Sequence, residues 1–471
     1  MDSETFRRLG HALVDWIAAY RERIESLPVM SRVEPGEIRA HLPPEPPREG
    51  GGLPAVVDAL DRTVLPGITH WNHPSFFAYF PANSSYASVL ADLVTAGLGA
   101  QGMSWQTSPA ATEVEDVMME WLRQLLGLSG AWSGVIQDTA STATLCALLC
   151  ARERATGYAQ NGAGLQGGGA PLVVYASEQA HSSVEKAALL AGFGKAHLRL
   201  LGTDDAYALR LDLLEAAIAE DLRAGRRPCA VVAAVGTTAT TAIDPVAGVA
   251  ALARRHGLWL HVDAAMAGTA MILPECRALW EGIEGADSLV LNPHKWMGTG
   301  FDLSAYYVRD PQHLVRVMST NPSYLRTAQD GAVRNLRDWG IPLGRRFRAL
   351  KLWFYLADVG VDALQARLRR DLENARWLAA EVDRAPSWER VAPVPLQTVC
   401  LRHLPPGAAD EAARTHHNLA LAARVNGAGR AYVTPSVLHG RQMIRVSIGA
   451  EGTERRHVEA VWRELRDAAA R

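Results

Sequence analysis

The chain has 471 residues, of which 48 are lysine or arginine and 50 are aspartate or glutamate, so its net charge is −2. That balance gives no electrostatic reason to expect a nucleic acid or a membrane surface as a partner. No apolar stretch is long enough to span a bilayer, and the charged N-terminus lacks a signal-peptide pattern. The five scattered cysteines form no CxxC pair, so we expect a cytoplasmic protein of two or three domains.

The first twenty residues predict an amphipathic helix with an aromatic face. Its apolar side chains recur at helical spacing: Phe6, Leu9, Leu13, Trp16, Ile17 and Tyr20. This face packs either on its own domain or on a second subunit, and the residues alone leave both possibilities open. The proline- and glycine-rich stretch from Pro43 to Pro54 is typical of a linker.

From about Ser84 to Leu356, short β-rich runs alternate with helical stretches. The runs "LVVYAS", "CAVVAAVGTT", "LWLHVDA" and "SLVLNPH" are separated by segments long enough for crossover helices. This alternation predicts a mostly parallel sheet covered by helices on both faces. From Val361 onward, a long helix, the runs "TVCLRHL" and "MIRVSIGA", and a closing helix predict a smaller α+β domain.

Two motifs suggest sites that their context excludes. Gly162, Gly164 and Gly167 fit the pattern GxGxxG, but they follow a predicted helix and precede a strand. A dinucleotide fingerprint has the opposite order, so we predict no nicotinamide site. His416 and His417 are adjacent on a helix, where their side chains diverge by about 100°. No carboxylate or cysteine stands at ligand spacing, and we predict no metal site.

Polar side chains follow four of the predicted strands at the point where each strand ends. They are His181, Thr237, Thr238, Asp263, Asn292, His294 and Lys295. The stretch "DTAS", from Asp138 to Ser141, stands directly before a helix. Each feature has a structural explanation when taken singly. A histidine can be a satisfied core residue, a carboxylate can cap a turn, and "DTAS" can be an N-cap alone.

Taken together, these residues describe one cofactor. Strand ends of a parallel sheet meet at one edge, where ligands bind. Small residues and a hydroxyl at a helix N-terminus suit a phosphate, and a buried carboxylate suits a protonated ring nitrogen. A histidine can stack on a flat ring, and a lysine either snorkels to the surface or forms an imine with an aldehyde. Phosphate, ring nitrogen and aldehyde are the parts of pyridoxal 5′-phosphate.

The motifs that carry these residues resemble a known family. "NPHKW", "HVDAAMAG", "EQAHSSVEKA", "FFAYFPANSSY" and "WGIPLGRRFRALKLWF" are similar to the group II pyridoxal-phosphate decarboxylases, and more closely to the aromatic-L-amino-acid decarboxylases. The resemblance implies an α/β fold of type I, aspartate aminotransferase-like, with a mostly parallel seven-stranded sheet. It also implies an intertwined homodimer with active sites at the interface. We expect an N-terminal helical dimerisation segment at 1–83, a cofactor-binding domain at 84–358 and a small α+β domain at 359–471.

The resemblance assigns roles by position. Lys295 would hold the cofactor, Asp263 would pair with the pyridine nitrogen, and His181 would stack on the ring. The other cofactor contacts would be Ala140, Ser141, Thr238, Ala265, Asn292 and His294. Tyr324 matches a tyrosine on the family's mobile loop that protonates the product carbanion. In this family, phenylalanine at that position accompanies oxidative deamination to an aldehyde, so Tyr324 favours plain decarboxylation.

The expected substrate pocket departs in part from the family pattern. Trp71, Tyr79, Phe80, Pro81 and Phe301 match aromatic-wall positions. Ala82 replaces a threonine of the family, and Gln101 and Met103 stand where the animal enzymes have larger apolar residues. Gly344 leaves space at the expected ring end, which suits an indole. We find no extra basic residue in this lining, which argues against an acidic amino acid as substrate.

The sequence therefore predicts decarboxylation of aromatic L-amino acids, of the dihydroxyphenylalanine, tryptophan, tyrosine and phenylalanine type, to aryl-ethylamines and CO₂. Pockets of this kind discriminate similar rings by only about 1–3 kcal/mol, so several substrates remain open. The nearest alternative is an aromatic aldehyde synthase on the same scaffold. A catalytically silent cofactor-binding protein is a second alternative, and intact Lys295, Asp263, His181 and Tyr324 argue against it.

Overall fold

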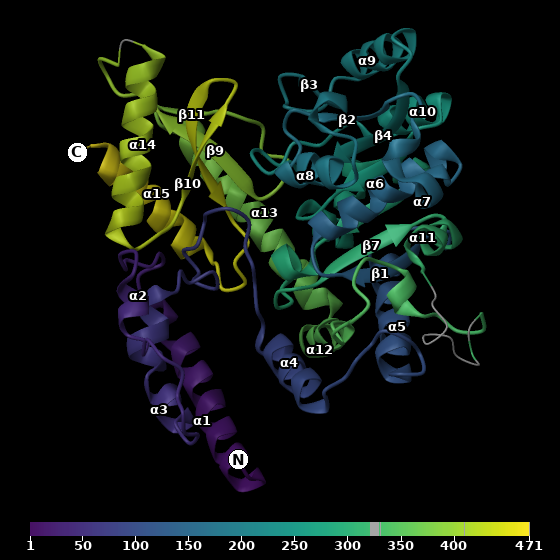
Figure 1. The fold of residues 1–471 in the computed structure, drawn as a ribbon. Helices are drawn as coiled ribbons and strands as arrows, with labels where there is room; N and C mark the ends of the chain where they lie inside the picture. The colour runs from purple at the N-terminus through teal and green to yellow at the C-terminus, as the bar shows by residue number, and fades with distance from the viewer. Residues whose placement is uncertain (321–328, 330, 409, 471) are drawn as a thin grey trace.

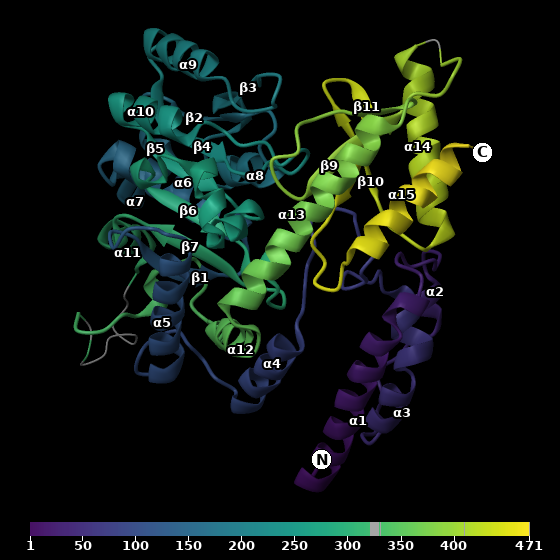
Figure 2. The same ribbon diagram turned by 180° about the vertical axis from the view of Figure 1, so that it is seen from behind.

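The computed structural model describes residues 1–320, 329, 331–408 and 410–470 (Figure 1). Tyr324 lies outside the described residues. The middle of the chain forms a large layered α/β structure, and the C-terminal part forms a smaller sheet with its helices. The N-terminal helices extend from the small sheet's side of the molecule, away from the large sheet (Figures 1 and 2). Within the described residues, no helix combines the length and the apolar character needed to cross a membrane.

The N-terminal part consists of helices α1 (Ser3–Glu22), α2 (Glu37–Ala40) and α3 (Leu53–Asp58). Asp2 caps α1 by accepting a hydrogen bond from the Thr5 N–H. Of the predicted aromatic face, Leu9 is buried, whereas Phe6 is 58% exposed. The Tyr20 hydroxyl oxygen lies 2.9 Å from Nδ1 of His70. The face is thus only partly covered by its own chain.

The large sheet has seven strands in the order β1-β7-β6-β5-β4-β2-β3. They are β1 (Ser133–Gln137), β2 (Leu172–Ser177), β3 (Leu198–Leu201), β4 (Arg227–Ala234), β5 (Trp259–Asp263), β6 (Ser288–Leu291) and β7 (Ser304–Val308). Only β7 runs antiparallel to its neighbours. The prediction of a mostly parallel seven-stranded sheet is therefore confirmed.

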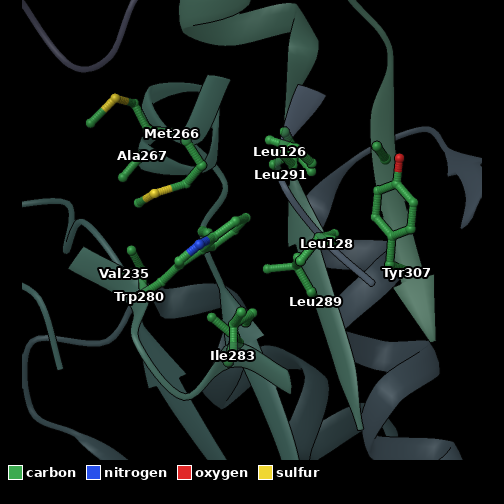
Figure 3. Packing of buried hydrophobic residues seen from close by; sticks show 14 of the residues in the cluster. Leu126, Leu128, Val235, Met266, Ala267, Trp280, Ile283, Leu289, Leu291 and Tyr307 are labelled. Carbon is green, nitrogen blue, oxygen red and sulfur yellow. The ribbon is translucent and has the colours of Figure 1, made fainter. Parts of the chain in front are cut away.

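Helices cover both faces of this sheet because the strand side chains are apolar in both directions. Val174 and Ala176 face the cluster formed with α6 (Ala140–Thr156), α8 (Ser182–Leu190) and α11 (Pro311–Met318). Val173 and Tyr175 face the opposite cluster. The helices there are α5 (Pro109–Leu125), α9 (Leu211–Arg223), α10 (Val246–His256) and α12 (Ala349–Val359). Figure 3 shows part of that cluster, where the Trp280 indole lies among aliphatic side chains.

Helices α4 (Tyr86–Leu98) and α7 (Ala159–Ala163) complete the large part. The GxGxxG glycines fall in α7 and the short turn after it, Gly164–Gly167, which precede β2. The motif therefore neither follows a strand nor opens a helix after one. This placement agrees with its exclusion as a dinucleotide fingerprint.

The C-terminal part is an antiparallel sheet in the order β10-β11-β9-β8 with helices packed on it. Its strands are β8 (Trp388–Arg390), β9 (Thr398–His403), β10 (Thr434–Leu438) and β11 (Arg441–Ser447). Its helices are α13 (Val361–Arg384), α14 (Glu411–Ala428) and α15 (Arg455–Ala469). The small α+β unit is confirmed, and its β10–β11 hairpin contributes to the site described next.

Candidate active site

Lys295 lies in a π-helical turn, Pro293–Met297, that directly follows β6. Its backbone angles, φ −99° and ψ −108°, interrupt that turn. The side chain is half-buried, and its Nζ lies 5.5 Å from the ring centroid of Phe80. Burial lowers the pKa of the Lys295 ammonium below its usual value, and the Asp263 carboxylate raises it in part. The lysine therefore does not snorkel to open solvent, and a lowered pKa favours the nucleophilic amine.

Asp263 is the last residue of β5 and is 8% exposed. Its Oδ1 accepts a hydrogen bond of 3.1 Å from the Ala265 N–H, as a turn-capping carboxylate would. The same carboxylate lines a cavity together with Lys295. The capping explanation and the cofactor explanation are thus compatible.

His181 stands at the N-cap of α8. Its Nδ1 accepts from the Ser183 N–H at 3.1 Å and lies 2.8 Å from the Ser183 hydroxyl. Part of the side chain is open to solvent, but lost hydration on the enclosed side lowers its pKa. These contacts assign a neutral ring with its proton on Nε2, which is suited to stacking on a flat heterocycle.

The N-terminus of α6 opens onto the same cavity. Thr139 caps the helix by accepting from the Thr142 N–H, so "DTAS" is an N-cap as well as a lining segment. Asn292 lines the same cavity, and its Oδ1 accepts a 2.7 Å hydrogen bond from the Ser304 hydroxyl, which also lies 3.3 Å from the Asp138 carbonyl. Nδ1 of His294 accepts from the Leu303 N–H at 2.9 Å, and burial lowers the pKa of His294 to about 4. His294 is therefore neutral at physiological pH.

This inner cavity has a volume of about 170 Å³. All nine residues predicted to contact the cofactor line it: Ala140, Ser141, His181, Thr238, Asp263, Ala265, Asn292, His294 and Lys295. Its walls offer the N–H groups of a helix N-terminus, threonine hydroxyls, one carboxylate and one amine. That donor set fits a phosphorylated pyridine aldehyde.

An outer hollow of about 640 Å³ shares Phe80, His181, Thr238, His294 and Lys295 with the inner cavity. Six of the nine predicted substrate residues line it: Trp71, Tyr79, Phe80, Pro81, Ala82 and Phe301. Trp71 and Tyr79 stack with their ring centroids 5.7 Å apart. An aromatic-walled hollow beside the lysine is what the sequence predicts.

The remaining three predicted substrate residues line neither hollow of this chain. Oε1 of Gln101 accepts a 2.7 Å hydrogen bond from the Arg345 N–H, beside Gly344. The Met103 carbonyl accepts from the Arg337 N–H at 2.8 Å. Gln101, Met103 and Gly344 therefore belong to a separate region of the same subunit.

Sequence reasoning missed Arg445, which is 3% exposed and lines the outer hollow. Its Nε donates to the Ala239 carbonyl at 2.8 Å, and its Nη1 donates to the Tyr79 carbonyl at 3.2 Å. Among the described residues, its Nη2 has no hydrogen-bond partner. The expectation of a lining without a basic residue is thus wrong. The signal was present, since an arginine interrupts the apolar run "MIRVSIGA".

The pyridoxal-dependent decarboxylase conserved domain matches residues 35–404. The chain belongs to that family. Over its whole length it is 42% identical to phenylacetaldehyde synthase from Arabidopsis thaliana, covering 97% of that protein. It is 40% identical to aromatic-L-amino-acid decarboxylase from Bos taurus, again with full coverage of this chain and 97% of the relative. This pyridoxal-phosphate decarboxylase is therefore a carboxy-lyase, and its cofactor is pyridoxal 5′-phosphate.

Solved structures agree with this assignment. The crystal structure of Oryza sativa TDC with PLP and tryptamine matches 100% of this chain and 98% of that chain, with a TM-score of 0.96 and 37% identity. Catharanthus roseus tryptophan decarboxylase in complex with L-tryptophan gives a TM-score of 0.93 at 36% identity, covering 100% and 99% of the two chains. The relatives thus include aromatic amino-acid decarboxylases and an aldehyde synthase.

Proposed function

We propose that this decarboxylase converts aromatic L-amino acids to aryl-ethylamines and CO₂. The observation that carries the proposal is the adjacency of the two hollows. The inner one is lined by the predicted cofactor residues and the outer one by Trp71, Tyr79 and Phe80, and they meet at Lys295. A substrate whose aromatic ring lies in the outer hollow would bring its amino group to the lysine.

Each side chain has a defined task in this proposal. Bound pyridoxal phosphate supplies an electron sink for the pair released when the Cα–carboxylate bond breaks. The Asp263 carboxylate holds a proton at the pyridine nitrogen, which strengthens that sink. The neutral His181 ring would stack on the heterocycle, and the Lys295 amine would bind the aldehyde group of the cofactor. Tyr324, outside the described residues, donates a proton to Cα.

Arg445 offers its unpartnered Nη2 to the substrate carboxylate. A guanidinium that is desolvated forms a strong, directional contact with a carboxylate. Because the Phe80 ring lies 5.1 Å from the guanidinium carbon, one arginine can orient both the aromatic wall and the leaving group. The substrate would then be held at its ring and at its carboxylate, with its amine near Lys295.

The second candidate is an aromatic aldehyde synthase, favoured by the 42% identity to the Arabidopsis thaliana enzyme. Tyr324 and His181 argue for the decarboxylase instead. A panel of L-amino acids, with amine, aldehyde and peroxide quantified by mass spectrometry and a peroxide assay, separates the two. We expect amine from aromatic substrates and none from Lys295→Ala. The control Lys195→Ala removes an exposed lysine paired with Glu185 and should retain turnover.

The homodimer is part of the same proposal. Helix α4 exposes a row of apolar side chains: Leu90, Leu93, Val94 and Leu98. It lies at the same end of the molecule as α1, whose aromatic face is only partly covered (Figures 1 and 2). We infer that a second copy covers both, and that Gln101, Met103 and Gly344 reach the partner's outer hollow. Light scattering on purified protein, giving twice the 51.0 kDa chain mass, is the expected result.

A cytoplasmic location remains part of the proposal. All five cysteines of the chain are free and buried. Burial raises the pKa of several of these thiols, including Cys229 to about 12, so they stay protonated and unreactive. Unpaired cysteines agree with a reducing compartment.

A further inference from the structure

Asn83 joins three segments of the chain that meet behind the lysine. Its Nδ2 donates to the Lys295 carbonyl at 2.9 Å and to the Gly449 carbonyl at 2.9 Å. Its Oδ1 accepts from the Glu451 N–H at 2.8 Å. The side chain is 1% exposed, so water does not compete for these contacts.

The contact to Lys295 falls at the interruption of the π-helical turn. With φ −99° and ψ −108°, the lysine does not follow the helical path of its neighbours. Its carbonyl oxygen points to the Asn83 amide instead. Two residues further on, the Ser85 N–H donates to the Gly298 carbonyl at 3.3 Å, so one short segment holds the middle of the turn and the residue that ends it.

The same segment carries the aromatic wall. Phe80, Pro81 and Ala82 line the outer hollow immediately before Asn83. Gly449 packs so closely that an added Cβ would stand 3.0 Å from both Pro81 and Trp296. Asn83 therefore ties the lysine peptide to the substrate wall on one side and to the end of β11 on the other.

We propose that Asn83 is a positioning residue, which fixes the Lys295 peptide so that the amine meets the cofactor aldehyde. The inference rests on the proposed function, since it takes Lys295 as the residue that holds the cofactor. A lysine side chain is a long lever. A tilt of roughly 20° at Cα displaces an amine about 6 Å away by about 2 Å, and an error of about 1 Å can cost about a hundredfold in rate.

The alternative is that Asn83 is only a satisfied core residue that stabilises the fold. Asn418 provides a matched control, because its side chain makes the same set of contacts elsewhere. Its Nδ2 donates to the His403 and Arg414 carbonyls, and its Oδ1 accepts from the His403 N–H. It is 0% exposed, and it lines neither the inner cavity nor the outer hollow.

The test compares Asn83→Asp with Asn418→Asp in the full chain. Each substitution keeps the shape and replaces two donors with a carboxylate that faces two carbonyls, so both should lower the melting temperature. Both proteins are stripped of cofactor and titrated with pyridoxal phosphate, then reduced with borohydride and mapped for the labelled lysine. We expect Asn83→Asp to weaken cofactor affinity and lower kcat by about tenfold or more, and Asn418→Asp to change neither by more than about twofold.

Equal cofactor affinity, labelling and kcat in the two variants, at similar melting temperatures, would overturn the positioning role and leave the proposed function intact. If the unsubstituted protein is labelled on another residue, the proposed function fails and the inference fails with it. Should Asn83→Asp be insoluble, Asn83→Ala and Asn418→Ala give the same comparison without added charge.

Discussion

The indole N–H of Trp296 donates a hydrogen bond of 2.9 Å to Oδ2 of Asp371. Trp296 follows the lysine, and Asp371 lies on α13. Arg367, one turn earlier on that helix, donates to the Trp296 and Met297 carbonyls and lies 3.5 Å from the Asp371 carboxylate. The longest helix of the C-terminal part thus holds the lysine turn from behind, while Asn83 holds it from the side of the aromatic wall.

We expect Asp371→Ala to be strongly destabilising. Asp371 is fully buried, and its loss leaves the Arg367 guanidinium buried without its carboxylate. Breaking a buried pair in this way costs about 3–5 kcal/mol of unfolding free energy. The measurement is urea-induced unfolding of the holoenzyme.

The control for that prediction is Glu275→Ala. Glu275 pairs with Arg369, also on α13, but both side chains are about half exposed, at 52% and 44%. Exposed pairs contribute only about 0–1 kcal/mol. Equal losses in the two variants would show that burial of the Asp371 pair does not matter.

Arg445 leads to the second prediction. If its Nη2 binds the substrate carboxylate, Arg445→Gln lowers kcat/KM for aromatic amino acids by about 10–100-fold. Inhibition by the product amine, which lacks a carboxylate, should change little. Arg441→Gln is the control, because Arg441 lies on the same strand and pairs with Glu389 instead.

If Arg445→Gln lowers kcat/KM for the amino acid and weakens inhibition by the amine to the same extent, Arg445 instead maintains the shape of the hollow. That outcome has a structural basis, since Arg445 also donates to the carbonyls of Tyr79 and Ala239. The ratio of the two effects, not either one alone, therefore decides its role.

The sequence predicted the inner cavity well for a physical reason. His181 and Lys295 each follow a strand of one sheet and Asp263 ends another, and parallel strands bring their ends to a common edge. Local order along the chain was therefore enough to predict that they meet. The alternation of strands and helices along the chain predicted a mostly parallel sheet, whereas the order of the strands within it was not predicted.

The outer hollow was only partly predictable. Arg445 reaches it because β11 packs against the segment around Phe80, a contact between residues more than 350 positions apart. No periodic pattern in the sequence predicts that these two distant segments pack against each other. Gln101, Met103 and Gly344 matched pocket positions by resemblance, yet within one chain they lie around Arg345 and Arg337.

The pH dependence of stability gives a third prediction. His73, His261 and His294 are buried, and burial lowers the pKa of each to about 4, against 6.5 for a free histidine. As the pH falls below 6.5, the unfolded chain takes up protons before the folded one does, so stability is lost toward pH 4. Each histidine contributes a slope of about 1.4 kcal/mol per pH unit. We expect His261→Asn to reduce the slope by that amount in urea titrations between pH 4.5 and 6.

Asp244 provides a counterpart of opposite sign. Burial raises its pKa to about 6, so the folded state keeps a proton that the unfolded chain has already lost, and stability falls as the pH rises from 4 to 6. Asp244→Asn removes this opposing contribution, so the net slope should become steeper by about 1.4 kcal/mol per pH unit. If both variants change the slope in the same direction, burial is not its cause.

The fourth prediction concerns Tyr324, which we propose decides between the two candidate reactions. We expect Tyr324→Phe to divert turnover from amine to aldehyde, because no hydroxyl then delivers a proton to Cα and molecular oxygen can react there. The aldehyde-forming reaction consumes one molecule of oxygen and one of water for each substrate, and it releases aldehyde, CO₂, ammonia and hydrogen peroxide. The measurement is the ratio of amine to peroxide for each molecule of CO₂.

The control is Tyr158→Phe, which removes a hydroxyl that lies 2.6 Å from Nδ1 of His313, at a tyrosine that lines neither hollow. That variant should keep the amine ratio of the unsubstituted enzyme. An unchanged amine yield in Tyr324→Phe would remove the tyrosine from the protonation step. Peroxide from the unsubstituted enzyme, at one molecule for each CO₂, would instead identify an aldehyde synthase, and the proton donor would then need another assignment.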